Sequence, residues 1–92
     1  MTIECNAEQI ERRLRERFTP SQLEVIDESA AHAGHVGANE TGEGTHFRVR
    51  ISCQAFNGLT KVKQHRLLYD ALDDFFAAGL HALALQTSAE QP

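Results

Sequence analysis

The chain has 92 residues, 41% of them hydrophobic, and 13 acidic against 9 basic residues set its formal net charge at −4. This length predicts a single domain over residues 1–92, too small to enclose a deep catalytic cavity and still keep a core. The acidic balance argues against generic nucleic-acid binding, which depends on neutralising phosphates, although it leaves room for a local basic face.

The first predicted element is a helix. Asn6 and Gln9 form a capping-box pattern at its start. Pro20 disfavours helical geometry in the residue before it, so we expect the helix to end within residues 19–21. The apolar stripe of this helix recurs at every fourth position: Ile10, Leu14 and Phe18.

Two strands are expected next. The segment Leu23–Ser29 predicts a short strand, and Thr45–Cys53 shows the clearest alternation of apolar and polar residues in the chain. Such alternation is typical of a half-buried antiparallel strand, with one set of side chains facing the core. The apolar set is Phe47, Val49 and Ile51, and the polar set is His46, Arg48, Arg50 and Ser52.

The C-terminal half predicts a short helical turn, a long helix and a strand. The turn is expected over Gln54–Gly58, with Phe56 as its anchor. The long helix is expected from Lys61, capped by Thr60, to about Ala78, because Gly79 is a stop signal. The last strand is expected over Leu80–Thr87. The buried stripe predicted for the long helix is Val62, Leu68, Leu72 and Phe75 or Phe76.

The order of these elements is helix, strand, strand, short helix, helix and strand. It predicts an α/β (α+β) fold in which the helices cover one face of a small mixed sheet of three strands. We expect the core to span about residues 7–87, with residues 1–5 and 88–92 as tails.

Histidine is concentrated in one part of the chain. His32, His35 and His46 lie within the fifteen residues from 32 to 46, in and beside a glycine-rich stretch. His81 follows Gly79 at the start of the last predicted strand. Imidazole suits borderline or soft metals near neutral pH. The sequence therefore predicts a shared or transient metal site that combines an imidazole of the glycine-rich stretch with His81.

Cysteine usage and the ends of the chain predict the compartment. Cys5 and Cys53 lie far apart, whereas a secreted chain of this size usually carries several disulfides. The first residues lack the basic and apolar segments of a secretory signal. No stretch approaches the ~20 apolar residues that span a bilayer. We expect a cytoplasmic protein that does not associate with membranes and keeps both thiols reduced.

Five short motifs resemble those of BolA-like proteins, in unbroken order from about Ala7 to Thr87. They are Val25-Ile26-Asp27-Glu28-Ser29 followed by His32, Gly44-Thr45-His46-Phe47-Arg48-Val49, Phe56-Asn57-Gly58, His65-Arg66-Leu67-Leu68-Tyr69, and Gly79-Leu80-His81-Ala82-Leu83-Ala84-Leu85. Each motif alone is weakly specific, but their common order is strongly so. The resemblance implies a fold like a class II KH domain, an α/β sandwich with the element order given above.

The resemblance also implies a partner and a cofactor. BolA-like proteins pair with monothiol glutaredoxins and share with them a two-iron, two-sulfur cluster that also contains glutathione. The family supplies a histidine from the last strand region, matched here by His81, and a histidine or cysteine from the loop between the first two strands. The spacing after Glu28 makes His32 the loop match, with His35 as the alternative. No cofactor is expected in the isolated chain.

Imidazole ligands would change the chemistry of such a cluster. An imidazole in place of a thiolate makes the cluster less negatively charged and raises its reduction potential, as in Rieske centres. His46 is expected either to donate a hydrogen bond to a loop ligand or to lie on a solvated strand face.

A basic cluster at the start of the long helix is the second candidate site. It is expected to dock the glutaredoxin or to hold an anion. The Arg-His-Arg of BolA-like proteins is Gln64-His65-Arg66 here, so one cation is missing, which weakens a nucleic-acid function more than cluster binding. The cluster consists of Lys61, Lys63, His65 and Arg66.

Two other classes of function rank lower. Some BolA-like proteins bind DNA and regulate transcription, and a small DNA-binding regulator is the alternative here. The chain has no Gly-x-x-Gly between the predicted strand and the long helix, which is where a nucleic-acid-binding KH domain uses one to clamp the backbone. An enzyme is not expected, because no Ser-His-Asp order, phosphate loop or complete metal motif is present. The free protein is expected to be a monomer or a weak homodimer. The face for DNA would consist of Arg48, Arg50, Lys61, Lys63 and Arg66.

Overall fold

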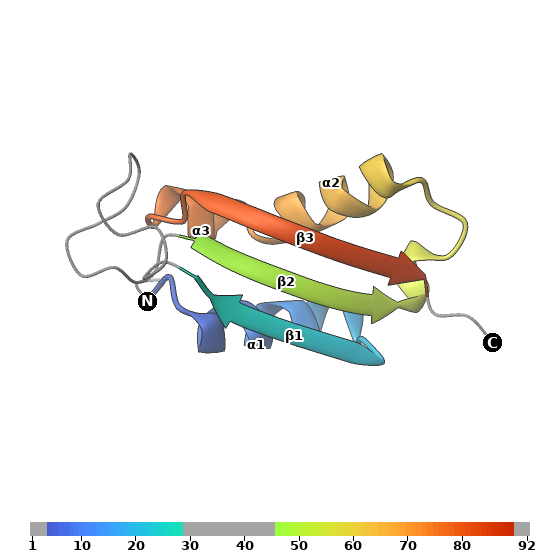
Figure 1. Ribbon diagram of the computed structural model, residues 1–92, viewed down its shortest axis with the longest axis horizontal. Coiled ribbons are helices and arrows are strands. Elements are labelled where there is room, and N and C mark those ends of the chain that lie inside the picture. Colours follow the sequence, from blue (N-terminus) through green and yellow to red (C-terminus); the bar gives the residue numbers. More distant parts are fainter. Residues whose placement is uncertain (1–3, 29–45, 90–92) are drawn as a thin grey trace.

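The computed structural model describes residues 4–28 and 46–89, so His32 and His35 lie outside the described residues. Figure 1 shows the strands as one layer and the helices as a second layer on one side of it. No helix in this part of the chain is long and apolar enough to cross a bilayer. The elements are α1 (Ala7–Phe18), β1 (Gln22–Asp27), β2 (His46–Cys53), the 3-10 helix η2 (Gln54–Phe56), α2 (Lys61–Ala71), α3 (Asp73–Ala77) and β3 (Ala82–Ala89).

The described strands form one mixed sheet in the order β1-β2-β3. β2 is central; it pairs antiparallel with β1 and parallel with β3. The register places Val25, Val49 and Leu85 in one row across the sheet, and Glu24, Arg50 and Gln86 in the next. Because successive side chains point to opposite faces, neighbouring rows serve opposite sides of the sheet. The predicted three-stranded mixed sheet is confirmed.

One face of the sheet carries the core, and α1, α2 and α3 all pack against it. The predicted apolar side of β2 is confirmed, and Cys53 joins it as a buried thiol. The same cluster includes residues from every helix, so the prediction of helices on one face is also confirmed. The buried cluster consists of Ile10, Leu14, Phe47, Val49, Ile51, Cys53, Phe56, Leu68, Leu72, Phe75 and Leu80.

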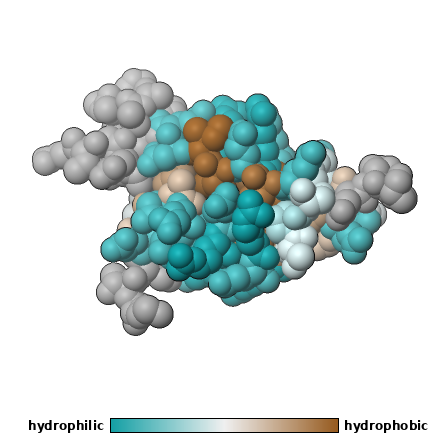
Figure 2. All heavy atoms as spheres, turned by 90° about the horizontal axis from the view of Figure 1, so that it is seen from below, coloured by the Kyte–Doolittle hydropathy of each residue, from teal (hydrophilic) through white to brown (hydrophobic). Residues whose placement is uncertain are grey.

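The opposite face of the sheet is not covered by any described element. Its rows carry mostly polar side chains, which suit contact with water. The outer side of α1 and the edge strand β1 is also largely hydrophilic, with one compact hydrophobic patch (Figure 2). Every described ion pair involves an arginine from either α1 or β2.

The predicted limits of α1 are confirmed at both ends. Asn6 Oδ1 accepts a hydrogen bond from the backbone N–H of Gln9 at 2.8 Å. Thr19 ends the helix in the left-handed region, with φ of 45°, and its N–H donates to the carbonyl of Arg15 at 3.1 Å. Pro20 disfavours the right-handed helical region for Thr19 on steric grounds, which explains the position of the break.

The long helix predicted from Lys61 to about Ala78 is divided into α2 and α3 at Leu72. The N–H of Phe75 donates to the Leu72 carbonyl at 2.9 Å, whereas in a continuous helix it would donate to the Ala71 carbonyl. The Ala71 carbonyl instead accepts from Arg13 Nη1 at 2.8 Å. The prediction was wrong because the group that replaces the helical donor lies far away in the sequence, on α1.

Val62 was predicted to be buried and is instead 66% exposed. The inward line of α2 runs through Gln64, Leu68 and Ala71, which follow the helical repeat. At 3.6 residues per turn, Val62 lies about 200° around the axis from Gln64 and so faces outward. The prediction was wrong because it placed only apolar residues on the inward side, whereas a glutamine occupies that side here.

The last strand starts and ends two residues later than predicted. Leu80 closes α3 rather than opening the strand, because its N–H donates to the Phe75 carbonyl at 3.0 Å and its side chain is buried. Gly79, with φ of 126°, makes the turn, in the hydrogen-bond pattern of a Schellman motif. Ser88 and Ala89, expected in the tail, belong to β3.

The beginning of the chain and the end of β1 also differ from expectation. Cys5, predicted to lie in a tail, is partly buried against the core. Burial, and secondly the charge of Asp27, raises the pKa of the Cys5 thiol. The first strand ends at Asp27, and Glu28 lies beyond it.

Candidate functional site

Two histidines far apart in the sequence meet at one end of the sheet. The ring centroids of His46 and His81 lie 5.4 Å apart, with the ring planes inclined by 55°. This centroid distance is typical of aromatic rings in contact. His81 is exposed, whereas His46 is only 9% exposed. His46 therefore does not lie on a solvated strand face. It lies directly beside His81.

The parallel pairing of β2 and β3 produces this contact. His46 opens β2, and its register partner is Ala82, the first residue of β3. His81 immediately precedes β3 and follows the Leu80 anchor. Because the buried Leu80 side chain and the hydrogen bond to Phe75 fix the backbone on one side, and the β3 ladder fixes it on the other, His81 is held at the sheet end.

The segment that carries the other candidate ligands leaves and re-enters the described fold at this same end. The N–H of Glu28 donates to the His46 carbonyl at 2.8 Å. The Glu28 carboxylate accepts a hydrogen bond from Arg48 Nε at 3.1 Å. His32 and His35 lie outside the described residues. The described part thus contributes His81, His46 and the Glu28–Arg48 pair to the candidate site.

The donors at this end of the sheet suit a metal centre that is shared with another molecule. An exposed imidazole such as that of His81 can reach a metal held by another molecule, and imidazole is a known ligand of two-iron, two-sulfur clusters. Among residues 4–28 and 46–89, no group of three or more His, Cys, Asp or Glu side chains could hold a metal ion. Any centre at this end would therefore need ligands from outside the described residues.

The five cations expected to form one DNA-binding face lie on two sides of the molecule. Arg48 and Arg50 alternate with the buried side chains of β2 and so lie on the open face of the sheet. Lys61, Lys63 and Arg66 belong to α2, which packs on the opposite face. The sheet itself separates the two groups.

Several of these cations are also engaged within the fold. Arg48 pairs with Glu28, and an oxygen of Glu24 lies 3.9 Å from Arg50. Lys61 Nζ donates to the Thr87 carbonyl of β3. Lys63 and Arg66 are exposed and form no ion pair with a described residue.

The outer side of α2 combines these cations with apolar groups. Val62, Leu67 and Tyr69 are the large hydrophobic residues that α2 exposes. Tyr69 stacks on Phe76 of α3, with ring centroids 5.4 Å apart. Exposed aromatic and apolar side chains beside arginine are the usual composition of protein-docking surfaces. His65, on the flank of this surface, is half-buried.

Gln64 explains one departure from the expected motif. It stands where BolA-like proteins were expected to carry an arginine, and it is buried. Its Nε2 donates to the Leu59 carbonyl at 3.0 Å, and its Oε1 accepts from Thr87 Oγ1 at 2.6 Å. Gln64 thus ties the start of α2 to β3 and contributes nothing to a charged surface.

Arg13 is a structural residue that the sequence pattern did not reveal. Its two terminal nitrogens donate to the Asp74 carboxylate at 2.7 and 2.9 Å, and its guanidinium lies 5.0 Å from the Phe75 ring centroid. Hydrogen bonding from Arg13 lowers the pKa of Asp74, and the same bonds raise the pKa of Arg13. This contact joins α1 to α3, the helix that leads to His81.

Comparisons with known proteins agree with this fold. The family model described as "BolA-like protein" matches residues 14–91. An uncharacterised protein of the cobS 5′ region of a Sinorhizobium species is 49% identical over 83 residues, covering 89% of this chain and 88% of that protein. The DNA-binding transcriptional regulator BolA of Escherichia coli is 38% identical over 80 residues, covering 87% and 71% of the two chains.

A solved structure shows the same architecture. The BolA domain of SufE1 from Arabidopsis thaliana superimposes with a TM-score of 0.81 at 41% sequence identity, and 90% of each chain is covered. The three-stranded mixed sheet and the helices on one of its faces are therefore the architecture of BolA domains. Sequence match and structural match together show that the chain belongs to the BolA-like protein family.

Proposed function

We propose that the chain is an adaptor that pairs with a monothiol glutaredoxin and supplies histidine ligands to a bridging two-iron, two-sulfur cluster. The observation that supports this most directly is the exposed His81 beside His46, at the end of the sheet where the β1–β2 connection begins and ends. His81, which immediately precedes β3, is the proposed ligand from the last-strand region. His32 is the proposed loop ligand, with His35 as the alternative.

The number of residues between Glu28 and His32 is compatible with His32 and His81 acting as a ligand pair. His32 follows Glu28 by four residues, and four residues span at most about 14 Å. Thiolates would come from the partner and from glutathione, because the described residues hold no complete ligand set. The cluster would supply redox and delivery chemistry. The chain itself would replace thiolate by imidazole and hold His81 in position, with no catalytic step of its own.

Docking is assigned to the outer side of α2. Lys63 and Arg66 offer two charges without a described partner, and Val62 and Tyr69 offer apolar contact area. We propose that the glutaredoxin brings an acidic rim to these residues. Reversal of both charges, Lys63→Glu with Arg66→Glu, should weaken the complex with and without cluster, while exposure of both side chains protects the fold.

The decisive experiment mixes the chain with a cluster-loaded monothiol glutaredoxin and records visible circular dichroism. Wild type should change the spectrum and form a heterocomplex. His81→Ala should keep the far-ultraviolet spectrum and the complex but lose the mixed-ligand signal. Gln54→Ala, an exposed change in η2, is the control. An unchanged visible spectrum with the wild-type chain would refute the proposal. His32→Ala and His35→Ala then identify the loop ligand.

A DNA-binding regulator is the second candidate, supported by the 38% identity to the Escherichia coli regulator. Its basic face is divided by the sheet, so of the five predicted cations one DNA duplex would meet at most the three of α2. Three neutralised phosphates correspond to a log–log salt slope of about −3. A gel-shift series in salt measures this slope, and absence of a shift at low salt would exclude the function for the isolated chain. The cytoplasmic location and the monomeric or weakly dimeric state remain predictions.

A further inference from the structure

The open face of the sheet has a hollow at the end opposite the two histidines. It has a volume of about 600 Å³ and lies where β1 begins and β2 and β3 end. Ser52 lies six residues beyond His46 on β2, which places the hollow about 20 Å from the histidine pair. It is therefore a separate site. The lining residues are Gln22, Leu23, Glu24, Arg50, Ile51, Ser52, Gln86, Thr87 and Ser88.

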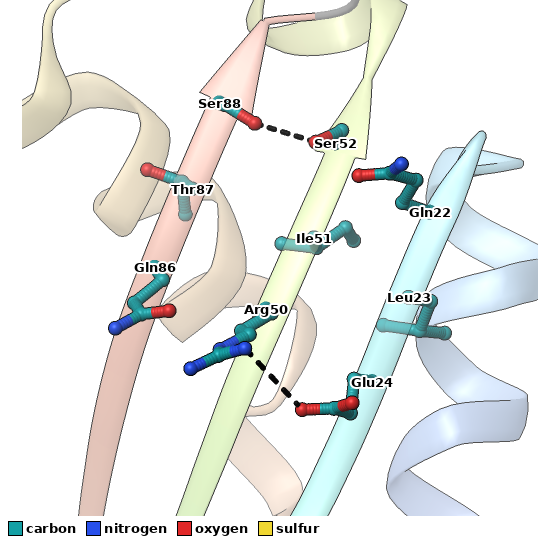
Figure 3. A pocket seen from close by; sticks show the side chains of 9 residues that line it. All are labelled: Gln22, Leu23, Glu24, Arg50, Ile51, Ser52, Gln86, Thr87 and Ser88. Atoms are coloured by element: carbon teal, nitrogen blue, oxygen red, sulfur yellow. Dashed lines mark hydrogen bonds and ion pairs between the residues drawn. The ribbon is translucent and has the colours of Figure 1, made fainter.

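The polar side chains of the hollow come from two alternate rows of the sheet, with the row of Leu23, Ile51 and Thr87 between them. Gln22, Ser52 and Ser88 form one row, and Glu24, Arg50 and Gln86 form the other. Figure 3 shows these six side chains on the same side of the strands. The Ser52 and Ser88 hydroxyls hydrogen-bond to each other at 2.5 Å. The hollow thus presents a cation, an anion and two amides around a hydroxyl pair.

Arg50 and Glu24 are adjacent without being joined by a hydrogen bond. Arg50 Nη1 lies 3.9 Å from Glu24 Oε1, and the side chains are 58% and 54% exposed. Arg13 and Asp74, by contrast, form two hydrogen bonds of 2.9 Å or less. Hydrogen-bonding capacity therefore remains on both Arg50 and Glu24, and a ligand with one group of each charge can use it.

The spacing selects the kind of ligand. In an α-amino acid the ammonium nitrogen and the carboxyl carbon are bonded to the same carbon, which places them about 2.5 Å apart. The nearest atoms of Arg50 and Glu24 are 3.9 Å apart. The carboxylate and the ammonium of one α-amino acid can therefore contact Arg50 and Glu24 at the same time. A single-stranded nucleic acid does not suit the hollow, because no described residue that lines it is aromatic and Glu24 offsets the charge of Arg50.

We propose that this hollow binds the head group of a free polar α-amino acid. The carboxylate pairs with Arg50, the ammonium with Glu24, and a polar side chain contacts the amides of Gln22 and Gln86. Because the site is open to solvent, the binding is weak.

The test is an amide NMR titration of the full chain with L-glutamine. Saturable shifts should be confined to residues 22–24, 50–52 and 86–88. N-acetyl-L-glutamine, which lacks the ammonium, and L-glutaminamide, which lacks the carboxylate, should bind about tenfold more weakly or not at all. Arg50→Gln and Glu24→Gln should each weaken the binding of L-glutamine by a similar factor. Arg12→Gln, which removes an exposed ion pair with Glu8 on α1, is the matched control and should change nothing.

Three results would overturn the proposal. They are the absence of saturable shifts, equal binding of the blocked compounds, and unchanged binding by the Arg50→Gln variant. Shifts of the same residues with protein concentration alone would assign the face to a second copy of the chain instead. None of these results depends on the glutaredoxin or on the cluster, so this proposal and the proposed function stand or fall separately.

Discussion

Arg13 offers the strongest test of how the fold is held together. We predict that Arg13→Met destabilises the chain by about 2 kcal/mol, because hydrogen bonds to charged groups contribute about 1.5–3 kcal/mol and a cation over a ring about 0.5–1 kcal/mol. The Arg13 side chain is 21% exposed and that of Asp74 43% exposed. Solvent screening therefore reduces the sum. The change also removes the described donor to the Ala71 carbonyl at the break between α2 and α3.

The measurement is urea and thermal unfolding, both followed by far-ultraviolet circular dichroism. For a domain of this size, a loss of about 2 kcal/mol lowers Tm by about 8–16 °C. Arg13→Lys keeps the charge but not the planar fork, so it should lose about half as much stability. Arg12→Met is the control, because the Arg12–Glu8 pair is exposed and such pairs contribute at most about 1 kcal/mol. Equal stability of Arg13→Met and Arg12→Met would refute the reasoning.

The same contact predicts a dependence on pH. Arg13 lowers the pKa of Asp74 in the folded state. A carboxylate whose folded pKa is lowered stabilises the fold above its unfolded pKa, and this stability is lost as the pH falls through the folded value. The stability difference between wild type and Arg13→Met should thus be constant at neutral pH and shrink below the ordinary aspartate pKa of about 3.9. A difference that grows with acidity would contradict this assignment.

Four further substitutions test the corrected features of the fold by urea unfolding. Val62→Ser should change the free energy of unfolding by less than about 0.5 kcal/mol, whereas Leu68→Ala should lower it by about 2–5 kcal/mol. A large loss of stability in Val62→Ser would show that Val62 is buried, as the apolar pattern predicted. Gln64→Leu should lower it by about 1–3 kcal/mol, because the Thr87 hydroxyl and the Leu59 carbonyl each lose a partner; unchanged stability would show that water replaces the amide. Gly79→Ala should lower it by about 1–3 kcal/mol through backbone strain alone, since an added Cβ meets no atom within 4 Å; no loss would mean that the turn relaxes.

Local patterns in the sequence were sufficient where neighbours in the chain decide the conformation. Asn6 with Gln9 and Pro20 set the limits of α1, and the alternation through Phe47, Val49 and Ile51 assigned the two faces of β2. Each of these signals operates within a few residues, so it is complete in the sequence. The same local motifs, taken in order, indicated the BolA-like family.

Local patterns failed where a residue far away in the sequence forms a hydrogen bond with the backbone or side chain concerned. The break at Leu72 depends on Arg13, which lies on another helix. The inward position of Gln64 depends on a hydrogen bond from Thr87, 23 residues later. No local window contains both partners of these contacts, and an apolar pattern assigns a glutamine to the surface.

By itself, the sequence determined that histidines are concentrated in the glycine-rich stretch and before the last strand, and it predicted the order of strands and helices apart from the division of the long helix. Only the tertiary structure decided that His46 and His81 touch, that the five cations divide between two sides, and that a polar hollow forms across three strands. The physical reason is the parallel pairing of β2 with β3. Register between strands 36 residues apart is set by the shared core and backbone hydrogen bonds, and it determines which side chains become neighbours.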